Sequence, residues 1–262
     1  MRSGNETRLK VRLDLAYDGS SFRGFARQPQ VPTVQGTLEL ALSKLTGRDV
    51  VTTGAARTDA GVHALGQVVS VPDLPDHADV DDLRRRLNAI CGPAMAVNAA
   101  SAVSDDFDAR FSARSRTYVY ALSDAPVHDP FLAPTVLFHN AGLDVDAMNE
   151  AAGHLAGAHD FAAFGRVGEG KTSVRNLFEL RCTRAGHLIR VRARANAFIQ
   201  QMVRSLVGTL IQVGEDRLDP SAIPGILEGR DRAAAGPVAP PHGLCLVAVE
   251  YDEGWSAPPT AT

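Results

Sequence analysis

Two hydrophobic periodicities alternate along the chain, and their order limits the folds that it can form. Residues 9–17 alternate apolar and polar side chains, which is the period of a half-buried strand. A helix is expected after the candidate N-cap Thr33, because residues 38–45 carry an apolar stripe at helical spacing. A second helix is expected over residues 80–90. The first part of the chain therefore predicts strands and helices in alternation.

The same order of strand, helix and strand returns later in the chain. Residues 117–122 alternate like a strand, and residues 145–155 carry a helical stripe. A hairpin with its turn at Ala185-Gly186 and a strongly amphipathic helix over residues 199–213 are expected to follow. This order predicts an α+β fold made of two similar α/β halves with mostly antiparallel sheets, rather than regular βαβ winding.

The length of 262 residues allows one or two domains. We expect an N-terminal half at residues 8–104, a C-terminal half at residues 105–252 and a tail at residues 253–262. A content of 45% hydrophobic and 22% charged residues excludes a mainly disordered chain, a collagen and a coiled coil. No apolar run approaches about 18 residues, so no transmembrane helix is expected. The first ten residues lack the apolar core of a secretory signal.

Cysteine and histidine spacing predicts neither a disulfide framework nor a metal site. The three cysteines, Cys91, Cys182 and Cys245, are widely separated and form no CxxC motif. The simplest location for such a chain is the reducing cytoplasm. The eight histidines show no zinc-ligand spacing, so we expect no bound metal.

The charges are segregated, although the formal net charge is only −3. Residues 166–204 contain nine basic side chains, and only Glu169 and Glu179 oppose them. A molecule with one basic face can bind a polyanion such as RNA even when its overall charge is slightly negative. An unevenly charged, solvated surface is the alternative interpretation, and the composition does not decide between the two.

One segment matches the pattern G-x-x-x-x-G-K-T of a phosphate-binding P-loop, over residues 165–172. Such a loop needs a helix after it, because the N-terminus of that helix binds the phosphates. The residues that follow Thr172 alternate like a strand instead. We therefore expect a surface loop that binds no nucleotide, and a P-loop phosphotransferase stays open as an alternative function.

A second glycine-rich segment places a carboxylate among small residues. It reads Arg57-Thr58-Asp59-Ala60-Gly61-Val62-His63-Ala64. The small side chains around Asp59 allow another molecule to approach the backbone closely. A single aspartate in such a loop is more often only a turn former, so the motif needs support from the rest of the chain.

That support comes from several further motifs, because the segment around Asp59 resembles the signature of the tRNA pseudouridine synthase A (TruA) family. The other segments that resemble this family, in the same order, are Tyr17-Asp18-Gly19, Phe22-Arg23-Gly24-Phe25, Val34-Gln35-Gly36-Thr37-Leu38-Glu39, Phe107-Asp108-Ala109-Arg110-Phe111-Ser112, Ala195-Asn196-Ala197-Phe198, Met202-Val203-Arg204 and Gly243-Leu244-Cys245. Phe25 stands where the family usually has Trp, and Gln200-Gln201 stands where a pair of His is common. The resemblance extends from about residue 9 to residue 251.

The resemblance implies a fold and an activity. The two sheets are expected to join side by side, with an active-site cleft between the halves. The expected reaction is the isomerisation of uridine to pseudouridine in the anticodon stem-loop of tRNA, at positions 38 to 40. It needs no cofactor. The expected partners are tRNA and a second copy of the chain in a homodimer.

The family's catalytic roles fall on three residues of this chain. Asp59 is the candidate carboxylate, because a carboxylate near C1′ can attack the sugar or stabilise its positive charge. Arg204 resembles the family's arginine that keeps this carboxylate ionised when a base covers it. Tyr118 resembles the residue that stacks on the target uracil, although a strand tyrosine is more often part of the core.

Further residues are expected to contact the RNA. The resemblance implies that Arg57 helps to take the target base out of the stack, and that Thr58 and His63 belong to the same site. Alternation along residues 189–194 predicts a row of arginines on one face of a strand. The arginines expected at RNA are Arg23, Arg110, Arg190, Arg192 and Arg194. A protein that binds RNA without catalysis is the second alternative function.

Overall fold

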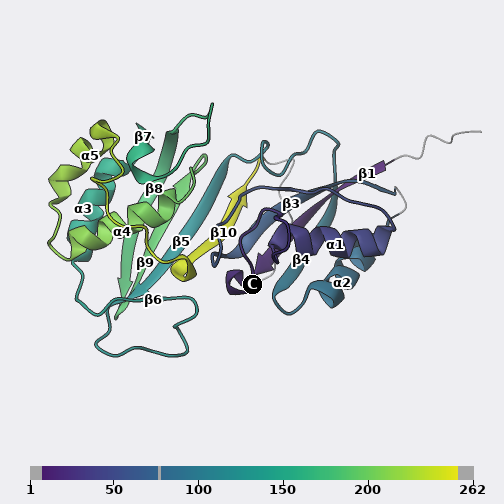
Figure 1. The fold of residues 1–262 in the computed structure, drawn as a ribbon, viewed down its shortest axis with the longest axis horizontal. Helices are drawn as coiled ribbons and strands as arrows, with labels where there is room; N and C mark the ends of the chain where they lie inside the picture. The colour runs from purple at the N-terminus through teal and green to yellow at the C-terminus, as the bar shows by residue number, and fades with distance from the viewer. Residues whose placement is uncertain (1–7, 76–77, 253–262) are drawn as a thin grey trace, which may run out of the picture. The chain divides into compact units, whose positions relative to one another are not determined.

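The computed structural model describes residues 8–75 and 78–252, and these residues form two compact units (Figure 1). The first unit extends through Arg114 and also includes residues 247–252, and the second unit is Ser115–Leu246. The first unit thus ends later than the predicted boundary after residue 104. The reason is that Phe107 and Ala109 pack in a cluster of the first unit, together with Ala55 and Val68. The predicted tail at residues 253–262 lies outside the described residues.

The first unit contains an antiparallel sheet with the strand order β4-β1-β3. A short strand, β2, pairs with β3. Two helices, α1 and α2, cover one face of this sheet (Figure 1). The elements are β1 (Arg8–Tyr17), a 3-10 turn η1 (Gly19–Ser21), α1 (Val34–Thr46), β2 (Thr53–Gly54), β3 (His63–Pro75), α2 (Val80–Cys91) and β4 (Met95–Val103).

The local structure of the first unit follows from its sequence pattern. Along β1 the apolar side chains of Val11, Leu13 and Leu15 are fully buried. The hydroxyl of Thr33 accepts a hydrogen bond from the Gly36 N–H at 3.2 Å, so the predicted N-cap of α1 is confirmed. These contacts fix β1 in the core of the first unit and set the start of α1.

The second unit contains an antiparallel sheet with the order β5-β9-β8-β7, and β6 pairs with β5 in parallel. The helices α3, α4 and α5 lie on one face of it (Figure 1). The elements are β5 (Ser115–Ser123), β6 (Leu137–Phe138), α3 (Val145–Leu155), β7 (Gly157–Asp160), η2 (Ala162–Phe164), β8 (Val174–Ala185), β9 (Leu188–Ala195), α4 (Met202–Gly214), η3 (Pro220–Ala222), α5 (Ile223–Gly229), η4 (Pro241–Gly243) and β10 (Leu244–Glu250). The chain passes from the second unit to the first within β10.

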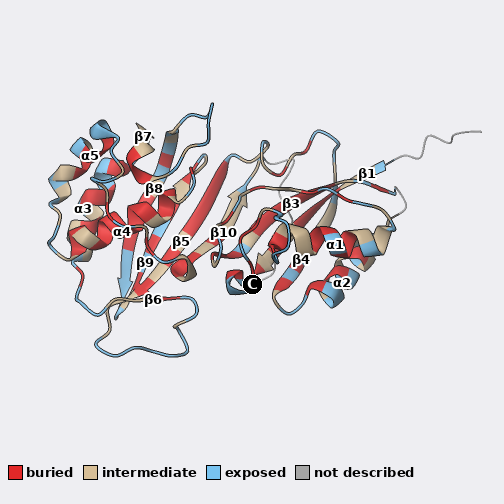
Figure 2. Ribbon diagram, viewed as in Figure 1, coloured by how far each residue is buried: buried red, intermediate tan, exposed pale blue. Residues whose placement is uncertain are grey.

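The predicted α+β class with mostly antiparallel sheets is confirmed, and the details differ in two places. Helix α4 begins at Met202 rather than near residue 199, and eleven of its thirteen residues are buried, so the polar side of this amphipathic helix does not face solvent (Figure 2). The segment 236–240 covers its polar side, where the Gly236 N–H donates to the Thr209 hydroxyl at 2.9 Å. The β8–β9 turn lies one residue later than predicted, at Gly186 and His187.

The described part of the chain offers neither a membrane span nor a metal cluster. None of the helices in residues 8–75 and 78–252 is long and apolar enough to cross a membrane. In the same residues, the side chains of His, Cys, Asp and Glu form no group of three or more that could hold a metal ion.

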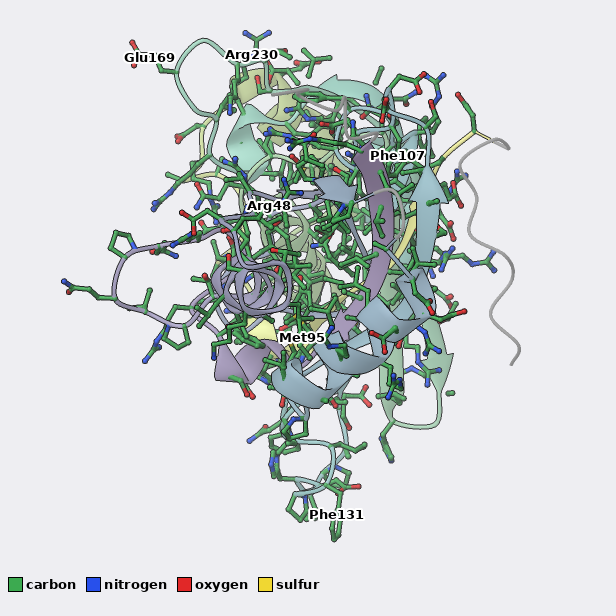
Figure 3. The ribbon with its side chains drawn as sticks, turned by 90° about the vertical axis from the view of Figure 1, so that its right-hand side faces the viewer. Arg48, Met95, Phe107, Phe131, Glu169 and Arg230 are labelled. Atoms are coloured by element: carbon green, nitrogen blue, oxygen red, sulfur yellow. The ribbon has the colours of Figure 1, made fainter. Side chains whose placement is uncertain are left out.

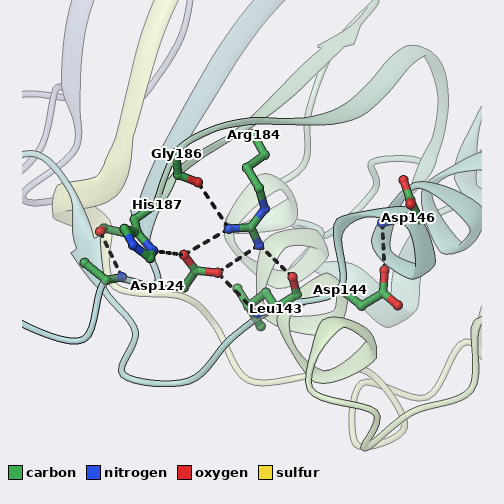
Figure 4. A network of polar contacts seen from close by, with 9 residues as sticks. Asp124, Leu143, Asp144, Asp146, Arg184, Gly186 and His187 are labelled. Atoms are coloured by element: carbon green, nitrogen blue, oxygen red, sulfur yellow. Dashed lines mark hydrogen bonds and ion pairs between the residues drawn. The ribbon is translucent and has the colours of Figure 1, made fainter.

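A buried carboxylate ties the end of β5 to the β8–β9 turn (Figure 4). Asp124 is 2.8 Å from Arg184 and 3.3 Å from His187, and it accepts the Leu143 N–H at 3.3 Å. Burial alone would raise the pKa of Asp124, but the hydrogen bonds from Arg184 and Leu143 and the charge of Arg184 outweigh it, so the pKa is lowered. The charged form therefore stabilises this end of the sheet.

We expect Asp124→Asn to reduce the free energy of unfolding by about 1–3 kcal/mol at pH 7, because it weakens hydrogen bonds to a charged group. A carboxyl with a lowered native pKa contributes its full stability above the unfolded pKa, and the contribution disappears as the pH falls through the native pKa. The difference between the two proteins should thus shrink in acid. Thermal unfolding between pH 7 and pH 3 measures this difference in the free energy of unfolding. Glu150→Gln is the control, because it removes an exposed charge of α3. If Asp124→Asn lost the same free energy of unfolding at all pH values, the charge of Asp124 would not be what stabilises this end of the sheet.

Candidate active site

Asp59 lies in the loop that connects β2 to β3 in the first unit. Asp59 is the first residue of a turn, because the Val62 N–H donates to the Asp59 carbonyl oxygen at 3.2 Å. The side chains alternate around this turn, since Arg57 is exposed, Thr58 is buried and Asp59 is half-buried. The loop therefore presents its carboxylate beside an exposed guanidinium, with Thr58 as the anchor between them.

Thr58 is held by a chain of buried hydrogen bonds. Its hydroxyl lies 2.8 Å from the Tyr17 hydroxyl at the end of β1. The amide of Gln67 on β3 donates to that same Tyr17 oxygen at 3.3 Å. Gln67 also donates to the Ala56 carbonyl at 2.9 Å and accepts the Ala56 N–H at 3.2 Å. Two neighbouring strands of the sheet thus fix the backbone on the N-terminal side of Asp59.

Two glycines allow the segment after β1 to pack directly against the loop. A β-carbon at Gly19 would lie 2.1 Å from the Val62 carbonyl oxygen, which leaves no room for any side chain. Gly24 has φ +105° and lies against Thr58 and Asp59, and the next residue, Phe25, donates its N–H to the Thr58 carbonyl at 3.0 Å. The glycines of the resembling motifs are therefore explained by close contact with the loop.

Two side chains of helix α1, Gln35 and Glu39, bond to Arg27 in the segment that follows Gly24. Gln35 accepts the Arg27 N–H at 3.0 Å and donates to the Thr52 carbonyl at 2.8 Å. The buried carboxylate of Glu39 accepts the Thr52 N–H at 2.9 Å and pairs with Arg27 at 3.2 Å. The family-like segment 34–39 thus joins the loop after β1 to the residue that precedes β2, and it leaves Arg23 exposed.

His63 lies beneath the loop rather than on its surface. Its Nδ1 accepts the Gly19 N–H at 3.2 Å and lies 3.2 Å from the Asp18 carboxylate. Burial tends to raise the pKa of Asp18, but hydrogen bonds from Ser20 and the contact with His63 outweigh it, so that pKa is lowered. These contacts favour a structural role for His63 over the predicted contact with RNA.

The second unit brings Tyr118, Tyr120 and Arg204 to the helix-covered face of its sheet. Tyr118 is 7% exposed, and its ring packs edge-on against Phe198 with a centroid distance of 5.3 Å. Tyr120 is fully buried and donates to the Pro240 carbonyl at 2.9 Å. Burial raises the pKa of Tyr120, and the nearby charge of Arg204 opposes the rise. Arg204 donates from Nε to the Ala239 carbonyl at 2.6 Å, so the segment after α5 orients it.

The arginines of β9 lie on the other face of that sheet. Tyr118 pairs with Ala193, and the adjacent Val119 pairs with Arg192. Because paired residues share a face and successive residues alternate, Arg192 points away from the Tyr118 side, and so do the other two arginines of the row, Arg190 and Arg194. Glu179 on β8 lies 3.2 Å from Arg192 and 4.0 Å from Arg194. The row predicted from the sequence exists, but it does not line the surroundings of Tyr118.

The P-loop-like segment lacks the geometry of a phosphate site. It lies between the 3-10 turn η2 and strand β8, so the strand predicted after Thr172 is confirmed. Figure 3 shows Glu169 at the tip of this projecting loop. Because no helix N-terminus points into the loop from the segment that follows it, the residues cannot bind phosphate in the manner of a P-loop.

The sequence did not reveal the role of Tyr17 and Gln67, whose buried hydrogen bonds fix Thr58 and Ala56 beside Asp59. In the sequence, Tyr17 stands at the end of an alternating strand, and Gln67 is a polar residue directly before Val68 and Val69. Their contact joins residues fifty positions apart, which no periodicity reveals.

Comparison with known proteins shows the family to which the chain belongs. The family model described as tRNA pseudouridine synthase matches residues 15–112 and 151–252. The chain is a member of this family. It is 44% identical over 253 residues to tRNA pseudouridine synthase A of Burkholderia mallei, Burkholderia thailandensis and Burkholderia multivorans, which covers 96% of this chain and 93% of each relative. The synthase is therefore an isomerase.

A solved structure was also found, the archaeal box H/ACA sRNP Nop10–Cbf5 complex. It aligns with this synthase at 10% identity and a TM-score of 0.33, over 86% of this chain and 60% of that chain. The likeness is too weak to bear on the fold.

We expect Gly19→Ala to reduce the activity of the synthase more than tenfold, because the new methyl group must displace the Val62 backbone and with it the loop. Hydrogen exchange of the amides in residues 56–62 should become faster in the same variant. Gly153→Ala on α3 is the matched control, since its β-carbon meets nothing within 4 Å. Normal activity in Gly19→Ala would show that the loop does not depend on this contact.

Proposed function

We propose that this synthase isomerises uridine at positions 38 to 40 of the tRNA anticodon stem-loop, with Asp59 as its catalytic carboxylate. The observation that carries the proposal is the Asp59 loop, in which buried hydrogen bonds from Tyr17 and Gln67 hold the residues beside a half-buried carboxylate. A reacting group must be held closely in place by its supporting contacts, and this loop provides them.

The reaction needs a carboxylate at the sugar rather than a redox group. The N1–C1′ bond breaks, the uracil turns over, and a C5–C1′ bond forms. The proton lost from C5 is balanced by one gained at N1, so the product is an isomer. Asp59 acts either by attacking C1′ or by accepting the C2′ proton. In both roles the carboxylate neutralises the positive charge that develops on the ribose.

We propose supporting roles for three more residues. Arg57 is exposed next to Asp59 and is proposed to help the target base leave the stack, which costs a few kcal/mol. Tyr118 is proposed to stack on the uracil, with its ring already held by Phe198. Arg204 is proposed to keep Asp59 ionised beneath the bound base, and its bond to Ala239 supports a fixed orientation.

The remaining proposals concern partners and location. We propose that the enzyme works as a homodimer in the cytoplasm, as its resemblance to tRNA-modifying enzymes implies. The arginines of β9 are proposed to attract the RNA through their charge, because they lie on the opposite face of the sheet from Tyr118. Arg23 and Arg110 are proposed as direct contacts from the first unit.

We expect Asp59→Asn to abolish pseudouridine formation and to leave the affinity for tRNA equal or slightly tighter, because a carboxylate repels phosphate. Pseudouridine yield and the tRNA dissociation constant should be measured on the same preparations at one salt concentration. Asp73→Asn is the control, since it removes an exposed charge elsewhere in the first unit. Retained activity would remove Asp59 from the chemistry, and an equal loss of binding would show that it only shapes the loop.

Arg204→Lys should reduce kcat at least tenfold, although the charge is kept, because a lysine has no planar guanidinium fork and loses the Nε–H bond to Ala239. The midpoint of thermal unfolding should change little, since one hydrogen bond contributes about 1 kcal/mol. Arg181→Lys, exposed on β8, is the matched control. If Arg204→Ala turned over like the wild type, the proposed role would be wrong.

A further inference from the structure

The loop between β4 and β5 exposes one aromatic ring and buries another. Phe107 is fully buried against Ala55 and Val68. Phe111, four residues later, is 80% exposed. Ala55 begins the Asp59 loop, so the two loops of the first unit are anchored in the same cluster. The exposed ring is therefore fixed relative to the Asp59 loop.

Hydrogen bonds hold Phe111 in place. The Asp108 carboxylate accepts the N–H groups of Arg110 at 2.8 Å and Phe111 at 2.9 Å. The Ser112 N–H donates to the Asp108 carbonyl at 2.9 Å, and the Ser112 hydroxyl accepts the Asp108 N–H at 3.0 Å. A side chain displayed on such a closed turn loses little conformational freedom when it binds a partner.

A second set of bonds fixes the turn to the sheet. The Tyr251 hydroxyl donates to the Ala109 carbonyl at 2.6 Å, and the Ala109 N–H donates to the Ser70 hydroxyl at 3.3 Å. The turn is thus a rigid extension of β3 and of the residues after β10. Its exposed ring cannot fold back into the cluster that holds Phe107.

The surroundings of Phe111 are charged and polar. The guanidinium of Arg110 lies over the Phe111 ring, 5.3 Å from its centroid. Arg114 follows three residues later and is exposed, paired with Asp252. A stable protein interface buries about 800 Å² per partner around an apolar centre, and one ring among charges does not provide that. Single aromatic rings beside arginine are typical of surfaces that bind unpaired bases of RNA.

We infer that Phe111 and Arg110 form a stacking platform for an unpaired base of the tRNA substrate. The base stacks on the exposed Phe111 ring, and Arg110 contacts the phosphate of the same nucleotide. The inference rests on the proposed activity toward tRNA, and it assigns an RNA contact to a residue outside the chemistry.

The test compares tRNA dissociation constants of the wild type, Phe111→Ala and Phe131→Ala over a range of salt concentrations. Phe131 is the matched control, because it is 92% exposed at the tip of a projecting loop of the second unit (Figure 3). Phe111→Ala should weaken binding by roughly 5- to 160-fold, the effect of losing one stacked base. The dependence on salt should keep its slope, since no phosphate contact is lost, whereas Arg110→Gln should lower that slope by about one.

A fluorescent variant reports the stacking directly. Phe111→Trp keeps an aromatic ring, so it should bind tRNA like the wild type, and the bound base should quench the emission of the new indole. Trp255 is the chain's single tryptophan, and Trp255→Phe removes its background. Tight binding of tRNA without quenching of the introduced indole would overturn the platform.

Two further results would also overturn the inference. One is an unchanged affinity for tRNA in Phe111→Ala. The other is a lower molar mass of Phe111→Ala than of the wild type in light scattering, which would make Phe111 a contact between copies of the chain. A wild type that binds no tRNA and forms no pseudouridine would instead refute the proposed function itself.

Discussion

The backbone of the Asp59 loop packs so closely against the segment after β1 that a β-carbon at Gly19 would overlap the Val62 carbonyl. Beside this close packing lies a buried series of hydrogen bonds. It joins the Thr58 hydroxyl to the Tyr17 hydroxyl, and the Tyr17 hydroxyl to the Gln67 amide. Buried polar groups of this kind specify one arrangement, because any shift would leave a donor or acceptor without a partner. The orientation of Asp59 and Arg57 depends on this arrangement.

The two faces of the sheet in the second unit are used differently. The covered face holds Tyr118 against Phe198 and Tyr120 against the backbone of Pro240, and the neighbouring Ala239 carbonyl orients Arg204 of α4. The open face carries the arginines of β9, and Glu179 neutralises part of their charge. A basic row on a strand is therefore not by itself a substrate cleft. What decides its role is the face on which it lies.

The elements and the family were predictable, but their mutual contacts were not. Alternation along β1, the cap at Thr33 and the strand after Thr172 depend on near neighbours, and periodicity reveals such features. The amphipathic pattern of α4 did not reveal that its polar side is covered, because the covering segment 236–240 comes from about thirty residues away. The face of Arg192 depends on the register between β5 and β9, which a one-residue shift would reverse. The polar residues Tyr17 and Gln67 meet only in the folded sheet.

The central claim is that this rigid loop delivers the Asp59 carboxylate to the ribose of the target nucleotide. A crystal structure of the enzyme with an anticodon stem-loop whose target nucleotide cannot rearrange would measure the distance from the Asp59 carboxylate to C1′. The account predicts a separation of about 3–3.5 Å, the contact distance of a group poised to react. It also predicts that the Thr58–Tyr17 hydrogen bond is unchanged in the complex. A carboxylate turned away from the sugar, or a loop rebuilt on binding, would contradict it.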